Sequence, residues 1–265
     1  MIEIAIIGGT GVYDPKILND VSEETLITPY GDVAYKVGTY AGKKIAFIPR
    51  HGSHHSIPPH KINYRANIWA IKKIGVKKII ATTAVGSLNP LMKPGDFVLI
   101  DQFLDFTKNR ISSFYEGGDR GVVHLDVTEA YCPDLRKTIH LAADTLGISI
   151  HNQGVYVCTE GPRFESPAEI KMFAILGGDL VGMTNVPEVV LAHEAEICYS
   201  TISMVTNYAA GISKNNLTHG EVLETMAANV DNIKNLIMKS IELINLEEKN
   251  CTCAETLSEF GGFTL

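Results

Sequence analysis

The chain has 265 residues, of which 45% are hydrophobic and 20% are charged, a composition typical of a globular protein with one large domain or two small ones. No apolar run reaches the roughly 18 residues that a membrane span needs, and a formal charge of −7 excludes a broad basic face for nucleic acid. Five cysteines, an odd number, argue against a disulfide framework and indicate a reducing compartment, so we expect a cytoplasmic protein.

The chain opens on an apolar segment, Ile2–Ile7, which we expect to be a buried strand and which lacks the pattern of a signal peptide. Gly8-Gly9-Thr10-Gly11 follows. Glycines there allow the backbone to approach an anion and Thr10 offers a hydroxyl, although a plain tight turn explains these residues equally well. No Gly-Lys-Ser/Thr follows, and Asp14 stands where G-x-G-x-x-G has its third glycine, so the segment matches neither phosphate-binding motif.

Residues 33–49 have the pattern of a β-hairpin around Ala41-Gly42 and lead into Arg50-His51-Gly52-Ser53-His54-His55. One arginine and three histidines in six residues form a cationic corner in an acidic protein. Arginine presents a planar fork of donors and His51 can add another, so we interpret this corner as a phosphate site. A metal site is one alternative, but no carboxylate or cysteine follows at ligand spacing. A solvated loop is the other.

Helical and strand patterns alternate through the rest of the chain. The apolar periodicity predicts helices at 61–74, at 133–146 and from 219 onward, and strands at 78–85, 97–103, 154–159 and 198–205. Residues 107–133 lack periodicity, and a loop of this length in a compact domain is usually functional or an interface. Because no linker or repeat interrupts the pattern, we predict one α/β domain over residues 1–265, with a mostly parallel sheet flanked by helices.

Polar residues fall at the predicted strand ends, where parallel sheets bind ligands. Thr82, Thr83 and Ala84 end one strand, and Asn207 follows another. Strand threonines and a turn-forming asparagine are the structural alternatives. Residues 155–194 add a Gly-Pro turn, a phenylalanine beside a carboxylate and a Met-Thr-Asn corner before a helix, although a strand-turn-helix with a satisfied buried glutamate would look the same.

Two features lie near the C-terminus. Thr218-His219-Gly220-Glu221 is a capping-box pattern that would make His219 the first residue of a long amphipathic helix, where the helix dipole favours a neutral imidazole. A surface histidine is the alternative. The tail, about 248–265, contains Cys251 and Cys253. Their spacing is not that of a zinc site, which would need further partners nearby, so we expect a solvent-exposed thiol pair, with a redox-labile disulfide as the alternative.

Together these motifs resemble the purine nucleoside phosphorylase / methylthioadenosine phosphorylase family over essentially the whole chain. The resemblance is carried by IIGGTGVYD, PRHGSHHSIPPHKINYRAN, TTAVGS, TEGPRFES, GMTNVPEVVLAHE and TNYAAGIS. It implies a mixed, mostly parallel sheet and a homo-trimer or homo-hexamer. It also implies phosphorolysis, in which a purine nucleoside and phosphate give free base and ribose 1-phosphate, with no metal or organic cofactor and with phosphate as co-substrate.

The resemblance also assigns site residues. It places the phosphate at Thr10, Arg50, His51, Thr83, Ala84 and Thr184. Met183 would lie against the ribose, Phe164 near the sugar and base, and His124 of the long loop at a neighbouring subunit's site. Because Thr184 precedes Pro187, a good first-turn proline, we expect helix N–H groups to assist the anion.

Three positions distinguish substrates within this family. An ionised Glu165 only accepts hydrogen bonds, so it suits the N1–H of a 6-oxopurine and opposes the bare N1 of adenine. Methylthioadenosine enzymes typically place a small hydroxyl residue there. Asn207 can donate to O6 and accept from a protonated N7, whereas adenine-using relatives have aspartate there and at the position of Ala209. His219 resembles the histidine that binds the 5′-hydroxyl, in place of a small apolar residue that receives an S-methyl group.

All three positions indicate inosine and guanosine, and mispaired polar groups can discriminate by roughly 10⁴-fold. In the implied mechanism the C1′–N9 bond lengthens towards an oxocarbenium-like state while phosphate attacks the opposite face. Asn207 and Glu165 would be the catalytic residues: the first meets charge developing on the purine and the second anchors N1–H.

Three alternatives remain at this level. A methylthioadenosine or methylthioinosine phosphorylase belongs to the same family. A nicotinamide oxidoreductase would fit Gly8–Gly11, but the third glycine and the acidic residue after a second Rossmann strand are missing. A nucleoside-binding protein without turnover would not need a phosphate site.

Overall fold

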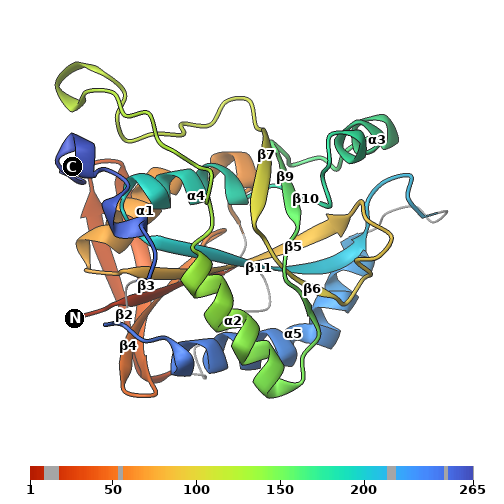
Figure 1. Cartoon of the computed structure of the whole chain (residues 1–265), viewed down its shortest axis with the longest axis horizontal. Helices are drawn as coiled ribbons and strands as arrows, with labels where there is room; N and C mark the ends of the chain where they lie inside the picture. The colour runs from red at the N-terminus through yellow and green to blue at the C-terminus, as the bar shows by residue number, and fades with distance from the viewer. Residues whose placement is uncertain (9–17, 53–55, 214–218, 248–249, 265) are drawn as a thin grey trace.

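The first strand, β1 (Ile4–Gly8), is buried on both of its faces. Ala5 and Ile7 belong to one apolar cluster, whereas Ile4 and Ile6 belong to another. A sheet with such a strand at its centre must be covered by helices on both sides. The computed structural model describes residues 1–8, 18–52, 56–213, 219–247 and 250–264 (Figure 1).

Two pairs of helices provide this cover. α1 and α4 pack together on one face of the sheet, and α2 and α5 pack together on the other, while α3 covers a third, smaller apolar cluster (Figure 1). Their bounds are α1 (Tyr64–Lys73), α2 (Pro133–Leu146), α3 (Pro167–Ile175), α4 (Asn185–Glu194) and α5 (His219–Leu243). The predicted helices at 133–146 and from 219 onward are therefore confirmed.

The described residues form an eleven-stranded mixed sheet. The remaining strands are β2 (Asn19–Thr28), β3 (Gly31–Tyr40), β4 (Lys43–Pro49), β5 (Lys78–Ser87), β6 (Phe97–Leu99), β7 (Gln102–Phe106), β8 (Ile150–His151), β9 (Val155–Thr159), β10 (Leu180–Gly182) and β11 (Cys198–Tyr208). The central strands β4, β1, β5 and β11 run parallel, as do β7, β9 and β10. The predicted fold class and hairpin are confirmed, since β3 and β4 pair antiparallel around Ala41-Gly42.

The strands that pair with β5 change along its length. On one side it pairs with β11 along its whole length. On the other side it pairs with β1 only as far as Ala81, and with β10 only from Gly86 onward. Residues 82–85 therefore have no strand partner on that side within the described part of the chain. Such a divergence of neighbouring strands leaves room for a ligand.

Several predicted boundaries are wrong, including the end of β5, which extends beyond the predicted residue 85 to Ser87. The predicted strand 97–103 is two strands: β6 pairs with β11, and after Ile100 and Asp101 the chain leaves to pair with β9 as β7. Short apolar runs lie on both sides of Asp101, and β6 is buried whereas β7 is only partly buried, so periodicity alone could not separate the two strands. β11 extends to Tyr208, and α1 begins at Tyr64 because the side chain of Asn63 accepts the N–H of Ala66. The residues of β2 are almost all exposed, so no apolar pattern in the sequence predicted this strand.

The C-terminal tail also differs from expectation. It contains two short 3-10 helices, Cys253–Glu255 and Ser258–Phe260, and Leu257 between them is fully buried. Cys253 is only 4% exposed and Cys251 is half-buried, so the expected solvent-exposed thiol pair is wrong. Among the described helices, none combines the length and the hydropathy that a membrane crossing requires.

Candidate active site

A cavity of about 300 Å³ opens beside residues 82–85 of β5. Mostly apolar walls with a few polar groups are typical of small-molecule sites. The structure brings most of the predicted residues to this one cavity: Arg50, His51, Thr83, Ala84, Phe164, Glu165, Met183, Thr184, Asn207 and Ala209 all line it.

Three predicted residues are not placed in the cavity. Thr10 lies outside the described residues. His219 is the first residue of α5, as predicted, but its side chain also lies outside the described part. His124 is exposed on the long loop after β7 and does not line the cavity of its own chain.

The most constrained group in the cavity is Arg50, which is 2% exposed. Its Nε and Nη2 donate to the two oxygens of Glu188 at 2.6 and 2.7 Å, and Nη1 donates to the carbonyl of Thr82 at 2.8 Å. Burial opposes the charge of Arg50, but the adjacent carboxylate outweighs it and raises the pKa above its ordinary value. The guanidinium is thus a fixed, charged donor whose orientation is set before any ligand arrives.

The neighbouring polar groups are similarly held. His51 lies with Nδ1 2.9 Å from the carbonyl of Ile57, which requires a proton on Nδ1. The hydroxyl of Thr83 is 2.7 Å from that of Ser203, directly opposite it on β11. Arg50, His51 and Thr83 therefore form one preorganised polar end of the cavity.

The start of α4 is irregular. Thr184 lines the cavity, but Val186 has non-helical backbone angles, so the regular helix starts only at Pro187. The N–H of Thr184 is 3.3 Å from the Tyr156 hydroxyl, and the N–H of Val186 is 3.3 Å from the sulfur of Cys158. These two amides therefore already have partners, and the expectation that helix N–H groups assist an anion stays a prediction for the amides of the first helical turn after Pro187.

The second polar end of the cavity lies farther along the strands. Thr83 pairs with Ser203, whereas Gly86 pairs with Asn207. Three residues of strand separate these pairs, which places Asn207 about 10 Å beyond the end marked by Arg50 and Thr83. One cavity thus has two separate polar ends, as a site for two reactants needs.

Glu165 is one polar group of this second end. The hydroxyl of Thr159, the last residue of β9, donates to Glu165 Oε1 at 2.6 Å. Burial raises the pKa of the Glu165 carboxyl above its ordinary value, and the bond from Thr159 opposes that rise. Phe164 beside it is 45% exposed at the edge of the cavity.

Asn207 is the other polar group at this second end of the cavity, and it is 4% exposed. The register between β5 and β11 shifts between Val205 and Asn207, which marks an irregularity of the β-bulge kind, and bulges redirect side chains. Thr206 Oγ1 donates to Asn207 Oδ1 at 2.8 Å, and Asn207 Nδ2 donates to the carbonyl of Tyr208 at 2.9 Å. These contacts fix which way the amide points and, as far as the described residues go, leave one amide N–H and one carbonyl lone pair for a ligand.

Sequence reasoning missed the residues that hold these groups in place. Glu188 is fully buried and also accepts from the Tyr199 hydroxyl at 2.7 Å. Its one signal in the sequence is a carboxylate inside the apolar run around Val186–Leu191, because a buried charge requires a partner. Thr159 and Thr206 had no such signal, since strand threonines are common.

The chain is similar to known proteins over almost its whole length. Residues 3–242 match the model of the Phosphorylase superfamily. The chain is 59% identical over 251 residues to a probable 6-oxopurine nucleoside phosphorylase of Moorella thermoacetica, covering 95% of this chain and 96% of that one. It is 54% identical to the 6-oxopurine nucleoside phosphorylase of Pyrococcus furiosus, with 97% and 98% covered, and 49% identical to the S-methyl-5′-thioadenosine phosphorylase of Nitrosopumilus maritimus, with 97% of each covered.

Among solved structures, a methylthioadenosine phosphorylase from an antarctic soil metagenomic library superposes with a TM-score of 0.91 at 35% identity, covering 97% of this chain and 91% of that one. The fold is therefore that of a nucleoside phosphorylase. The chain belongs to the Phosphorylase superfamily.

Proposed function

We propose that this protein is a 6-oxopurine nucleoside phosphorylase, which converts inosine or guanosine and phosphate into free base and ribose 1-phosphate. The observation that carries the proposal is the presence of both Glu165 and Asn207 in a cavity that Arg50 also lines. A carboxylate that accepts N1–H and an amide that donates to O6 are complementary to a 6-oxopurine and mismatched to adenine. Relatives named 6-oxopurine nucleoside phosphorylase at 54% to 59% identity support it.

In this proposal the charged donor Arg50, with His51 and Thr83, holds phosphate on the face of the ribose opposite the base. Met183 lies against the sugar. As the C1′–N9 bond lengthens, negative charge moves onto the purine, and an amide N–H of Asn207 donates a hydrogen bond to O6. Solvent supplies a proton to N7, and the carbonyl of Asn207 accepts a hydrogen bond from the resulting N7–H. The amide is already oriented by Thr206 and Tyr208, so no reorganisation is needed during the reaction. No metal or organic cofactor takes part.

A methylthioadenosine phosphorylase is the second candidate. The observation in its favour is the apolar wall that α5 adds to the cavity through Val222, Leu223 and Met226, which could receive a methylthio group. Relatives with that name, at 49% identity, belong to the same family. Glu165 opposes this candidate, since its carboxylate would face the bare N1 of adenine.

Phosphate-dependent release of base from inosine, guanosine, adenosine and methylthioadenosine, measured side by side, separates the candidates. We expect turnover of inosine and guanosine, with kcat/KM at least roughly 10²-fold above that of either adenine nucleoside. A preference for methylthioadenosine would overturn the assignment of Glu165 and Asn207. Base release without phosphate would overturn phosphorolysis itself.

A further inference from the structure

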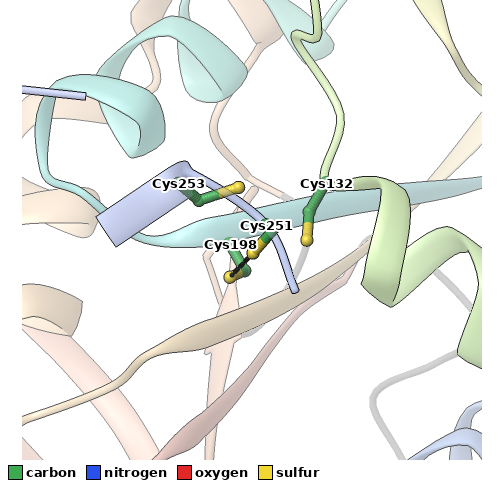
Figure 2. Close-up of side chains that lie close together, drawn as sticks. All are labelled: Cys132, Cys198, Cys251 and Cys253. Atoms are coloured by element: carbon green, nitrogen blue, oxygen red, sulfur yellow. Dashed lines mark hydrogen bonds between the residues drawn. The ribbon is translucent and has the colours of Figure 1, made fainter. Parts of the chain in front are cut away.

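Four of the five cysteines converge from separate parts of the chain (Figure 2). Cys132 precedes α2, Cys198 opens β11, and Cys251 and Cys253 lie in the tail after α5. Their four sulfur atoms all lie within 4.8 Å of one another. We propose that these four cysteines hold one Zn²⁺ ion as a structural site that ties the C-terminal tail to the body of the domain.

The spacing of the sulfur atoms fits this ion. A tetrahedral Zn²⁺ with Zn–S bonds of about 2.3 Å places its sulfur ligands about 3.8 Å apart. The sulfurs of Cys198 and Cys251 are 3.5 Å apart, and the other pairs stay below the 4.8 Å limit. A disulfide would need a separation of about 2.05 Å, and all four thiols are free. The set is closed at four soft ligands, which is typical of a structural zinc site without an open catalytic position.

The surroundings also suit a metal thiolate. Cys132 is the N-cap residue of α2, and its sulfur accepts the N–H of Leu135 at 3.5 Å, an outer contact of the kind that orients metal ligands. Cys132 and Cys253 are buried, whereas Cys251 is partly exposed and gives the ion a route from solvent. On binding, Zn²⁺ would replace four S–H protons, which pass to solvent, and leave a centre with a net charge of −2.

The position of the site indicates a stabilising role and no part in turnover. Cys198 and Asn207 stand near opposite ends of β11, so the site lies about 30 Å along the strand from the base-binding end of the cavity. Beyond the two tail cysteines, Leu257 is fully buried, and Phe263 packs edge-to-face on Phe114 at 5.3 Å between ring centroids. The ion would fasten a segment that covers part of the long loop after β7.

The direct test uses the full-length protein, purified under reducing conditions without chelator, with zinc alone as the added metal. We expect about one zinc ion per chain by elemental analysis after extensive buffer exchange. Replacing zinc by Co²⁺ should give the strong visible bands and sulfur-to-metal charge transfer of a tetrahedral thiolate site. Substoichiometric zinc together with four freely titrating thiols would overturn the proposal. A mass lower by two or four hydrogens, which means disulfides, would also overturn it.

Variants locate the site. The double variant C251S/C253S should retain less than about a tenth of the zinc, whereas C158S should retain all of it, because the sulfur of Cys158 contacts the carbonyl of Val186 at 3.5 Å and lies outside the cluster. Phosphorolysis by the double variant should stay within about twofold at low temperature, while its Tm no longer responds to a chelator. Unchanged zinc content in the double variant would contradict the assignment even if the wild-type protein contains the metal.

Discussion

At the level of single residues, the charge of Arg50 is matched by a carboxylate before a ligand binds. Arg50 is paired with Glu188, and Glu188 also accepts from Tyr199, so the buried pair brings little net charge to the polar end. A phosphate there would be held by oriented donors more than by an excess positive charge. Within the described part of the chain, Arg50 has one Nη1 N–H left for this purpose after its bonds to Glu188, Thr82 and, at 3.5 Å, Ile7.

Breaking the buried pair should therefore be costly. The variant E188Q keeps the shape of the side chain but leaves the guanidinium without a countercharge, which we expect to destabilise the fold by about 3–5 kcal/mol. That corresponds to a Tm lower by about 6–20 °C for a domain of this size. The control is E3Q, which removes the exposed pair with Lys77 and should cost less than about 1 kcal/mol. Equal shifts in Tm for the two variants would contradict a special role for Glu188.

Variants of Asn207 test whether the base that binds is a 6-oxopurine. We expect N207A to lower kcat/KM for inosine by about 10²–10³-fold, the usual effect of removing one preorganised donor. N207D is the matched variant, because it keeps the size and the accepting oxygen but cannot donate to O6. It should lose activity on inosine and gain on adenosine relative to the wild type, as steady-state kinetics on both substrates would show. Near-normal turnover of inosine by N207A would refute the mechanism.

Because of Glu165, we expect kcat/KM to fall at acidic pH. Burial raises the pKa of this carboxyl, so it becomes protonated at a higher pH than an exposed glutamate does. Only the ionised form accepts N1–H freely, and kcat/KM for inosine should therefore fall as the pH decreases through the raised pKa. E165Q still accepts through its carbonyl but does not titrate, so it should lose about tenfold in kcat/KM and lack this acidic limb. An unchanged pH profile in E165Q would assign the limb to another group.

At the level of elements, α3 is attached to the site through its first turn. Ser166 follows Glu165 directly and forms a capping box with Glu169, whose carboxylate also binds Arg163. The bonds from Arg163 and from the backbone of Ser166 lower the pKa of Glu169 to about 2. Because the cap fixes where the helix begins, it also fixes the backbone that carries Phe164 and Glu165.

Loss of the Ser166 cap should weaken substrate binding in addition to lowering the stability of the fold. S166A is expected to destabilise α3 by about 1 kcal/mol and to raise the KM for inosine with little change in kcat. N63A removes the N-cap of α1, which does not line the cavity, and should give a similar loss of stability with an unchanged KM. Thermal melts and inosine saturation curves of the two variants would make the comparison. A higher KM in both would show that the effect is general.

At the level of the whole molecule, His124 raises the question of assembly. It is exposed and does not line the cavity of its own chain, as expected if it serves a neighbouring subunit of a trimer or hexamer. Light scattering should then give three or six times the chain mass of 28.9 kDa. A mass of one chain would contradict the proposal that His124 acts across an interface.

Complementation tests this sharing directly. H124A and N207A should each be weakly active, and coexpression of the two should restore roughly a quarter of the sites if each site takes His124 from a neighbour. If both residues served the same subunit, every site in the mixture would carry one defect and no activity would return. Coexpression of N207A with N207D is the control that should show no recovery.

Much of the fold and of the site could be predicted because the signals are local. The buried first strand and the hairpin at Ala41-Gly42 follow from neighbouring residues, and the family motifs carry the residues of the cavity. The exposed strand β2 and the break between β6 and β7 could not be predicted, since pairing with distant strands decides them. The bonds that fix Asn207 come from its neighbours Thr206 and Tyr208, but no pattern of residue types shows that these groups point toward one another.

The sequence by itself determined the alternation of helices and strands, the two polar ends of the site and the chemistry of the base that they fit. Only the tertiary structure decided which groups share a partner. It paired Arg50 with Glu188, 138 positions apart, and gathered Cys132 and Cys198 beside Cys251 and Cys253. The reason is physical. The partners of a buried charge or thiol are the groups that the fold brings within a few ångströms of it, and the spacing of residues along the chain does not reveal which groups these are.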